Sequence, residues 1–148
     1  MTPHSLETLG DVFTFNDVIV FFGKKNAQPS EIKSASPGKS LCVLKQVHGD
    51  KLHEAASSAE PEGDAHWSRD PKNLLLVKSA DCLPVMVASP RNNIVLGIHS
   101  GWRGVVSRIT EKSIETLRLQ KDPDLRVWIG PHIQKNSFEV DKDVAEKI

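Results

Sequence analysis

The sequence predicts a single domain of strands and helices in which the strands outnumber the helices. Short apolar runs recur along the chain, each bounded by Asp, Pro, Asn or Gly, and one segment shows helical spacing of its apolar residues. A length of 148 residues with 39% hydrophobic residues suits one hydrophobic core. We therefore expect one domain over residues 1–148.

The predicted strands follow one another with turns between them. The first is VIVFF at 18–22, and the segment 23–40 after it is rich in Gly, Pro, Ser and Lys and is expected to be a surface loop. Further strands are predicted at 41–47, 74–78, 84–88, 94–98 and 125–130. The turn sequence PRNN at 90–93 predicts that the strands on either side of it form a hairpin.

Two segments predict helices. Four apolar residues recur at helical spacing between 104 and 118, with no Gly or Pro after Gly104: Val105, Ile109, Ile114 and Leu117. They predict one amphipathic helix. Asp141 is a candidate N-cap of a second helix, which stops at Ile148 after barely two turns, so we expect a domain shortened after residue 148.

Charge and hydropathy exclude two classes of partner. Nineteen basic residues balance nineteen acidic ones without a block of one sign, which argues against nucleic acid and anionic membranes as partners. No apolar segment approaches the length needed to span a bilayer. The two cysteines are too few for a disulfide framework, so we expect free thiols and a cytoplasmic protein, with Cys42 as a small buried hydrophobe.

Three short segments each supply one good transition-metal ligand. KQVHGD at 45–50, SADCLPV at 79–85 and GIHSGWRG at 97–104 carry His48, Cys82 and His99. A thiolate with two imidazoles suits zinc, and three protein ligands leave a position open, as a catalytic site requires. We expect Cys82 and His99 at the ends of neighbouring hairpin strands, with His48 at the end of a third strand.

Copper is the alternative metal, since a mixed thiolate and imidazole set also suits it. Multicopper oxidases hold their metals with several His-x-His pairs, and the six histidines of this chain include none. The ligand count therefore argues against a multicopper laccase.

The GWRG turn is a candidate anion site. Gly101 to Gly104 opens the predicted amphipathic helix, and Arg103 stands in its first turn. Free N–H groups at a helix N-terminus, together with a guanidinium, can hold phosphate. The alternative is that Trp102 packs and Arg103 pairs with a surface carboxylate.

Six motifs along the chain resemble those of one known family. They are QVHG at 46–49, GDA at 63–65, ADCLP at 80–84, HSGWRG at 99–104, WIGP at 128–131 and FEV at 138–140. In letters, order and spacing the chain resembles the laccase-domain, or polyphenol oxidase, family over roughly residues 41 to 144. The resemblance implies an α+β fold with mixed β-sheets flanked by helices, a YfiH-like layered α/β/β/α arrangement, in a chain that is a monomer or homodimer.

The resemblance also implies an activity. Members of the family are regarded mostly as zinc-dependent purine nucleoside phosphorylases, acting on adenosine, inosine or guanosine with phosphate as co-substrate, and as adenosine deaminases at the same site. Carried over to this chain, Cys82, Asp81 and Arg103 would be catalytic. Asp81 would move a proton or orient a histidine, and Arg103 would hold phosphate. Asp64 of the GDA motif would polarise the leaving purine or cap a turn.

The chain departs from the family pattern in two places. Members carry a Thr-Arg-x-Gly-Gly-Val-Ser stretch near the N-terminus, where this chain has FFGKKNAQPS at 21–30, so Lys24 or Lys25 would stand in for the arginine without its planar fork. Where members have a cysteine-containing stretch, this chain has His132, which is a proton shuttle or an exposed loop residue.

Three alternatives to the phosphorylase stay open. Cys82 activated by His99 would make a cysteine-nucleophile hydrolase. A copper polyphenol oxidase is the second alternative. The third is a catalytically impaired relative that keeps the fold but has lost turnover through the altered loop and the short C-terminus.

Overall fold

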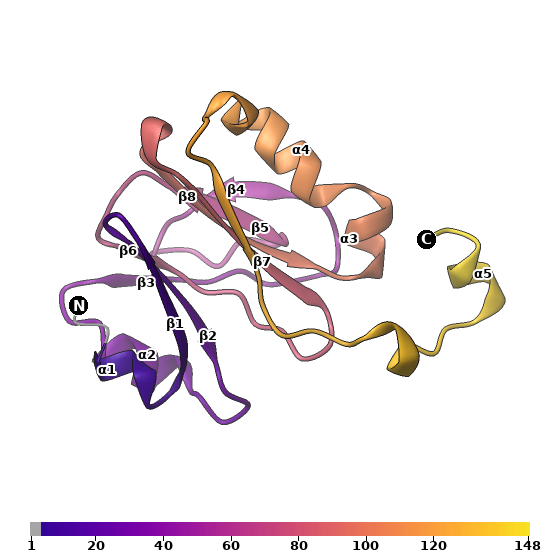
Figure 1. The fold of residues 1–148 in the computed structure, drawn as a ribbon, viewed down its shortest axis with the longest axis horizontal. Coiled ribbons are helices and arrows are strands. Elements are labelled where there is room, and N and C mark those ends of the chain that lie inside the picture. The colour runs from indigo at the N-terminus through magenta and orange to yellow at the C-terminus, as the bar shows by residue number, and fades with distance from the viewer. Residues whose placement is uncertain (1–3) are drawn as a thin grey trace.

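The residues that the structure describes, 4–148 of this computed structural model, are organised around one mixed sheet of five strands (Figure 1). In spatial order these strands are β4 (Leu52–Glu54), β5 (Ala65–Ser68), β8 (Ile94–Ser100), β7 (Leu83–Ser89) and β9 (Arg126–Ile129). Strands β4 and β5 are parallel, and the other neighbours are antiparallel. The expectation of an α+β domain with a mixed sheet is confirmed.

The hairpin β7–β8 occupies the centre of this sheet. Its two strands pair without interruption from Leu83 opposite Ser100 to Ser89 opposite Ile94. A 3-10 turn at Pro90–Asn92 connects them, and Asn93 closes the turn with a φ of 51°, a left-handed conformation that Asn tolerates. The predicted hairpin is confirmed, and both strands are apolar along most of their length because the sheet is covered on both faces.

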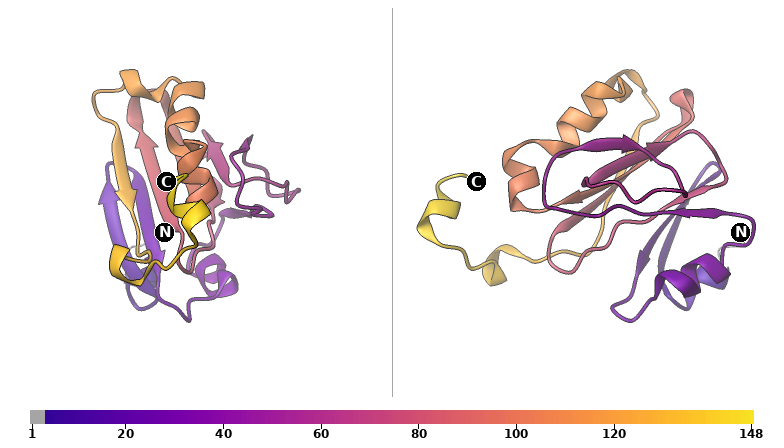
Figure 2. Two further views of the ribbon diagram at one scale, coloured as in Figure 1. Left: turned by 90° about the vertical axis from the view of Figure 1, so that its right-hand side faces the viewer. Right: turned by 180° about the vertical axis from the view of Figure 1, so that it is seen from behind.

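Helices α3 (Trp102–Val106) and α4 (Ile109–Thr116) cover one face of the sheet (Figure 2). The core that they form with it contains Ala65, Leu96, Ile98, Ile109 and Leu119. The prediction of a single helix between 104 and 118 was wrong, because Arg108 has a φ of 58° and separates the two helices. This left-handed residue turns the chain so that Ile109 enters the core with no exposure. Among the described residues no helix is both long and apolar enough to cross a membrane.

Two small sheets cover the opposite face. One is the hairpin of β1 (Gly10–Phe15) and β2 (Val18–Gly23), and the other is the parallel pair β3 (Ser40–Cys42) and β6 (Asn73–Leu75). The hairpin is anchored where Phe15 meets Trp128 of β9, with ring centroids 6.2 Å apart. A cavity of about 280 Å³, lined mainly by aliphatic groups, lies between β2, β6 and β7–β8. The runs predicted as strands at 41–47 and 74–78 are therefore strands only in part.

The segment predicted as a loop at 23–40 contains a short helix, α2 (Pro29–Ser34). Pro29 occupies its first turn, and the backbone N–H of Gln28 donates to Oε2 of Glu31 at 2.8 Å, as in a capping box. The helix was missed because Pro29 and the capping box lie in a segment whose composition is typical of loops. Helix α1 (His4–Glu7) and strands β1, β4 and β5 were not predicted either.

The last described residues lead away from the sheet (Figure 1). They contain a 3-10 turn at Lys135–Ser137 and helix α5 (Lys142–Ala145). Asp141 is the N-cap of α5, as predicted, although its side chain makes no capping hydrogen bond. The position of the N-cap of α5 was therefore predicted correctly.

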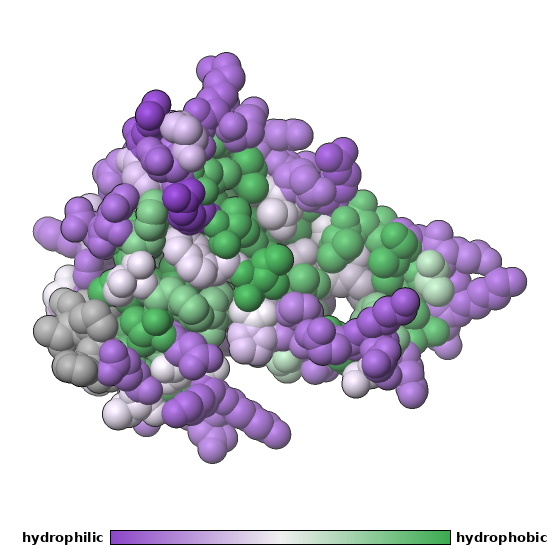
Figure 3. Space-filling model, in the orientation of Figure 1, coloured by the Kyte–Doolittle hydropathy of each residue, from purple (hydrophilic) through white to green (hydrophobic). Residues whose placement is uncertain are grey.

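Strand β9 forms one edge of the five-stranded sheet and keeps an apolar surface. Val127 and Ile129 are 47% and 57% exposed, whereas Trp128 between them faces the β1–β2 hairpin. Figure 3 shows apolar surface across the middle of the molecule, where β9 runs in Figure 1. The hydrophobic core between the sheet and helices α3 and α4 therefore does not extend to strand β9.

One ionisable side chain is buried in the sheet without a partner for its ring nitrogen. His66 of β5 is 1% exposed, and its Nε2 makes no hydrogen bond. Burial, with a smaller contribution from the neighbouring His53, lowers the pKa of His66 to about 4. His66 is therefore neutral in the folded protein at neutral pH.

Acidification is expected to destabilise the protein through His66. An unfolded chain binds a proton at this histidine with a pKa of about 6.5, whereas the folded-state pKa is about 4. Between these values the unfolded state binds more protons, so the free energy of unfolding falls as pH falls, by about 3 kcal/mol in total. Urea unfolding at several pH values between neutrality and pH 4 measures this decrease.

The variant His66→Leu is the control, because it removes the titrating group and leaves the surface carboxylates unchanged. Its free energy of unfolding should decrease less than that of the wild type over the same pH range. Parallel curves for the two proteins would contradict the assignment of the decrease to His66.

Candidate metal centre

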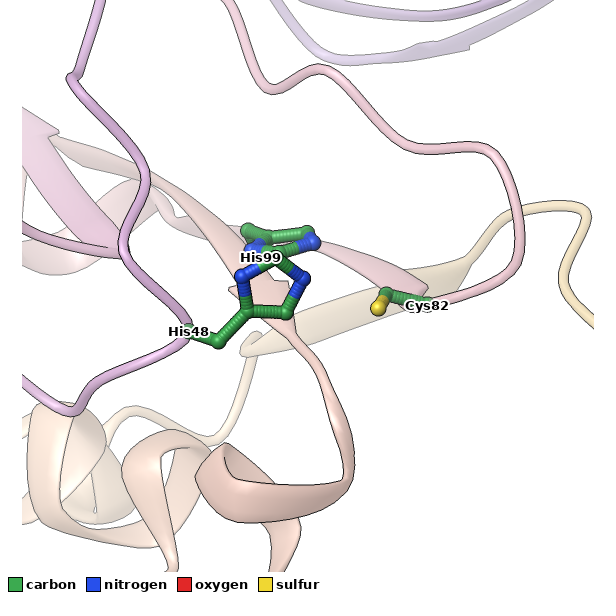
Figure 4. Close-up of side chains that lie close together, drawn as sticks. All are labelled: His48, Cys82 and His99. Atoms are coloured by element: carbon green, nitrogen blue, oxygen red, sulfur yellow. The ribbon is translucent and has the colours of Figure 1, made fainter. Parts of the chain in front are cut away.

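Three predicted ligands converge on one point of the structure (Figure 4). The ligand atoms of His48, Cys82 and His99 all lie within 4.8 Å of one another. The imidazoles of His48 and His99 meet edge to face, with ring centroids 4.8 Å apart. The three residues are 34 and 17 residues apart in the sequence, and the fold brings them together at one place.

The register of β7 and β8 positions two of the three ligands. Cys82 immediately precedes β7, whose first residue, Leu83, pairs with Ser100, and His99 lies opposite Pro84. Cys82 and His99 are therefore at the same end of neighbouring strands, as predicted.

His48 is held differently from the prediction. It lies in the loop between β3 and β4, not at a strand end, and its φ is 59°. This left-handed conformation is uncommon for residues other than glycine, although His adopts it more often than most. Here the carboxylate of Asp64 stabilises it by accepting the backbone N–H groups of residues 47–49.

Asp64 is completely buried and accepts four hydrogen bonds. Its Oδ1 accepts from the backbone N–H of His48 at 3.0 Å and from Nδ1 of His99 at 2.8 Å. Its Oδ2 accepts from the backbone N–H groups of Val47 at 3.2 Å and Gly49 at 2.7 Å. One carboxylate therefore shapes the loop that carries His48 and orients the ring of His99.

These hydrogen bonds also determine the protonation of the pair. Burial alone would raise the pKa of Asp64, but the bonds from His99 and from the three amides outweigh it and keep the pKa below its ordinary value. With Nδ1 of His99 donating to the carboxylate, Nε2 is the nitrogen left to bind a metal. Such a carboxylate–histidine pair is typical of metal sites in proteins.

The structure supports only one of the two roles expected for Asp64 from its motif. Asp64 is not free to polarise a purine, because it is buried and both oxygens are occupied. The expectation that it caps a turn was correct in part, since it binds three consecutive amides of the 47–49 turn. Nothing in the sequence indicated its contact with His99, 35 residues away.

Gly101 leaves the room that the three ligands need. A Cβ at this position would lie 3.0 Å from Cδ2 of His48 and 3.2 Å from Sγ of Cys82. Exposure increases from His99, which is buried, through Cys82 to His48, which is exposed. The cluster is therefore anchored on the sheet side and open to solvent on the side of His48, an arrangement that fits a metal with a position left for substrate.

The surroundings of Cys82 disfavour a free thiolate. Burial, and after it the negative charges of Asp81 and Asp64, raises the pKa of the Cys82 thiol. A nucleophilic cysteine needs the opposite shift. A bound cation would reverse this effect, because metal binding takes the deprotonated sulfur. Both cysteines are free, as predicted, and Cys42 is buried.

The predicted catalytic residues Asp81 and Arg103 lie in segments next to the ligands. Asp81 is exposed, and its carbonyl accepts the N–H of Ile133 at 2.9 Å. Arg103 is exposed and stacks on the ring of Trp102, with Cζ 4.6 Å from the ring centroid. Within residues 4–148 no carboxylate pairs with Arg103.

Three further candidates from the sequence are His132, Lys24 and Lys25. His132 is half-buried, and its Nδ1 lies 2.8 Å from the carbonyl oxygen of Gly130. Lys24 and Lys25 are exposed, and Nζ of Lys24 donates to the carbonyl of Thr8 at 3.5 Å. None of the three belongs to the cluster of metal ligands.

The variant Asp64→Ala is expected to lower the free energy of unfolding of the metal-free protein by about 3 kcal/mol or more, because it leaves four donors without their buried acceptor. It should also abolish tight metal binding. Urea unfolding and metal analysis after dialysis measure the two effects. Asp81→Asn, which changes an exposed carboxylate, should alter the stability by less than about 0.5 kcal/mol, and equal losses in both variants would rule out the special role of Asp64.

Comparison with known proteins identifies related chains over the same residues. The family described as multi-copper polyphenol oxidoreductase laccase matches residues 24–148. A purine nucleoside phosphorylase of Rickettsia conorii is 32% identical over 141 residues, which cover 88% of this chain and 59% of the relative. One of Synechocystis is 38% identical over 122 residues, 75% of this chain and 46% of the relative. The chain thus spans about half the length of the curated relatives it matches.

Solved structures agree with this relationship. A protein of Neisseria meningitidis superposes with a TM-score of 0.70 at 28% identity, over 84% of this chain and 53% of that chain. YlmD of Geobacillus stearothermophilus superposes with a TM-score of 0.66 at 28% identity, over 76% and 47%. The predicted fold, and three potential metal ligands that lie close together, are thus found together with a family match over most of the sequence. This chain belongs to the family described as multi-copper polyphenol oxidoreductase laccase.

Proposed function

We propose that this chain carries the metal centre of a zinc-dependent purine nucleoside phosphorylase. The observation that carries the proposal is the cluster of His48, Cys82 and His99, with Asp64 behind His99. Relatives named purine nucleoside phosphorylase are 31–38% identical to the chain. Because the chain spans only about half the length of these relatives, their activity is a proposal for this chain.

Zinc fits the donor set better than copper does. One thiolate and two imidazoles are a typical set for a catalytic zinc. A multicopper centre needs ligands for several metals, and in the described part of the chain the one cluster of potential ligands is that of His48, Cys82 and His99. The two cysteines are free, which fits a cytoplasmic protein whose thiolate ligand stays reduced.

In phosphorolysis an oxygen of phosphate forms a bond to C1′ of the ribose while the bond from C1′ to the purine nitrogen breaks, and the departing purine takes up a proton. When bound, zinc supplies a Lewis acid that polarises an atom of the substrate. Arg103 is suited to hold the phosphate, because it is exposed beside the ligands and has no carboxylate partner in residues 4–148. Helix α3 has only five residues, so the guanidinium contributes more than the helix end.

Proton transfer is assigned to Asp81. Its carboxylate is exposed and precedes Cys82 directly, so it can exchange protons with solvent next to the metal. The same residue would serve adenosine deamination, in which water adds at C6 of adenine and ammonia leaves. Deamination of adenosine is the second activity proposed for this site.

A cysteine-nucleophile hydrolase is less well supported. Cys82, His99 and Asp64 do form a thiol–imidazole–carboxylate series, but the raised pKa of Cys82 and the second imidazole from His48 both favour a metal. An impaired relative would keep the metal without turnover. Turnover of nucleosides separates it from the phosphorylase.

Purified protein is expected to contain about one zinc per chain, and Cys82→Ala is expected to lose it, because two imidazoles alone do not complete a tight site. Elemental analysis by plasma mass spectrometry after dialysis against a weak chelator measures this. Cys42→Ala, which removes the other thiol, should keep the zinc. Copper in the wild type would favour oxidation chemistry, and metal-loaded protein that is inactive on adenosine, inosine and guanosine with phosphate would contradict the phosphorylase.

Arg103→Ala is expected to raise the KM for phosphate by about tenfold or more, because a charge-assisted bidentate contact is lost. Arg103→Lys should recover part of that loss, since the charge returns without the fork. Initial rates of base release from inosine at varied phosphate concentrations measure both. The exposed Arg118 offers a control, and an Arg118→Ala effect of the same size would show a general dependence on surface charge.

A further inference from the structure

The segment that presents Cys82 is the least supported part of the metal centre. Residues 77–81 run from β6 to β7 outside any strand of the described structure. One backbone hydrogen bond holds the end of this segment, from the N–H of Ile133 to the carbonyl oxygen of Asp81 at 2.9 Å, and the hydroxyl of Ser79 donates to the carbonyl oxygen of Cys82. Beyond Cys82 the chain is fixed by the pairing of Leu83 with Ser100. Between residue 77 and Ser79, before these contacts, the segment that leads to Cys82 depends on contacts that side chains provide.

Gln46 provides such a contact with both ends of its amide group. Its Nε2 donates to the carbonyl oxygen of Lys78 at 2.6 Å, and its Oε1 accepts the N–H of Lys78 at 2.8 Å. The primary amide thus pairs with the backbone of Lys78 as a neighbouring strand would. Both hydrogen bonds are made only in this orientation of the amide, since a flipped amide would set donor against donor.

The position of this contact connects the two ligand loops. Gln46 precedes His48 by two residues, and Lys78 precedes Cys82 by four. Asp64 joins His48 to His99, but no hydrogen bond from Asp64 reaches the segment that leads to Cys82. The Gln46 pair completes the connection among the three ligands.

We propose that Gln46 is a positioning residue of the metal centre, which holds Cys82 at the distance from His48 and His99 that a metal requires. The proposal rests on the metal centre proposed above. Bonds of about 2.0 to 2.3 Å in a tetrahedral arrangement place ligand atoms roughly 3.5 Å apart, and the three ligand atoms already lie within 4.8 Å. The Gln46 pair keeps the flexible approach to Cys82 close to this arrangement before metal binds.

The two hydrogen bonds between Gln46 and Lys78 suit a role in positioning better than a large contribution to global stability. Lys78 is exposed and Gln46 is only half-buried, so water competes for their hydrogen bonds and the folded state gains little from them. The residue before Gln46 is held independently, by the ion pair of Lys45 with Glu62 at 2.8 Å and by backbone hydrogen bonds of Lys45 with Pro61 and Gly63. Loss of the Gln46 pair should therefore affect the thiolate ligand while the fold persists.

Three variants and one control test the proposal. Gln46→Ala removes both hydrogen bonds, and Gln46→Met removes them while filling a similar volume, which guards against a folding defect. Gln46→Glu keeps an acceptor for the N–H of Lys78 but turns a carboxylate oxygen toward its carbonyl. Lys45→Ala removes the neighbouring exposed side chain and leaves the amide pair intact.

Zinc affinity, measured by competition with a chromophoric chelator, is expected to fall by about tenfold in all three Gln46 variants and to change by less than about twofold in Lys45→Ala. In cobalt-substituted protein the thiolate-to-cobalt absorption band should weaken or shift in the Gln46 variants alone, a signature that a purely structural loss would not produce. Hydrogen exchange of the metal-free protein should be faster over 77–81 in the same variants.

The outcomes separate this proposal from the one on which it rests. Wild-type protein that binds zinc, with unchanged affinity and spectrum in Gln46→Ala and Gln46→Met, would overturn the role of Gln46 alone. Faster exchange without a change in affinity would likewise reduce Gln46 to a loop contact. Wild-type protein that binds no zinc would overturn the metal centre and the positioning role together.

Discussion

The buried carboxylate of Asp64 is the group on which the site depends. It accepts four hydrogen bonds in the protein interior, one from the imidazole of His99 and three from consecutive backbone amides at 47–49. An unpaired carboxylate would not be tolerated at 0% exposure, so these donors are required for its burial. In return the carboxylate stabilises the left-handed conformation of His48, and its bond to Nδ1 of His99 leaves Nε2 of that ring for the proposed metal. One electrostatic requirement therefore assembles two ligands from distant parts of the chain.

The central hairpin supplies the rigid half of the same site. Strands β7 and β8 pair over seven residues each, and their register brings the residue before β7 next to the end of β8. Gly101 then lets the chain leave β8 without filling the space among the ligands. The proposed ligands thus differ in how they are held. His99 is held by a strand and a carboxylate, and His48 by a loop that a carboxylate shapes. Cys82 is held by the strand that follows it and, on the other side, by a single backbone hydrogen bond at Asp81. This difference explains why the contact of Gln46 with Lys78 falls next to Cys82.

Local patterns in the sequence predicted the parts of this structure that depend on local chemistry. The β7–β8 hairpin and strand β2 were predicted from apolar runs and turn residues, and the proximity of His48, Cys82 and His99 was predicted from residue types that bind metals. The parts that depend on tertiary contacts were missed. Arg108 breaks the predicted helix because Ile109 must reach the core, and a residue with no turn preference carries the break. Asp64 and Gln46 act on partners 35 and 32 residues away, and single-sequence spacing contains no signal for such pairs.

The electrostatics of Cys82 explain why these residues suit a cation better than covalent chemistry. Two carboxylates, Asp81 beside Cys82 in the chain and Asp64 behind His99, raise the pKa of the thiol together with burial. A nucleophilic cysteine would need its negative charge favoured, and these neighbours oppose it. The same neighbours would attract a divalent cation, and a cation bound there would stabilise the thiolate as its ligand. Burial and the negative charge around Cys82 thus disfavour a free thiolate, whereas a cation bound beside Cys82 would favour the thiolate, so the same residues fit the proposed metal centre better than a nucleophilic cysteine.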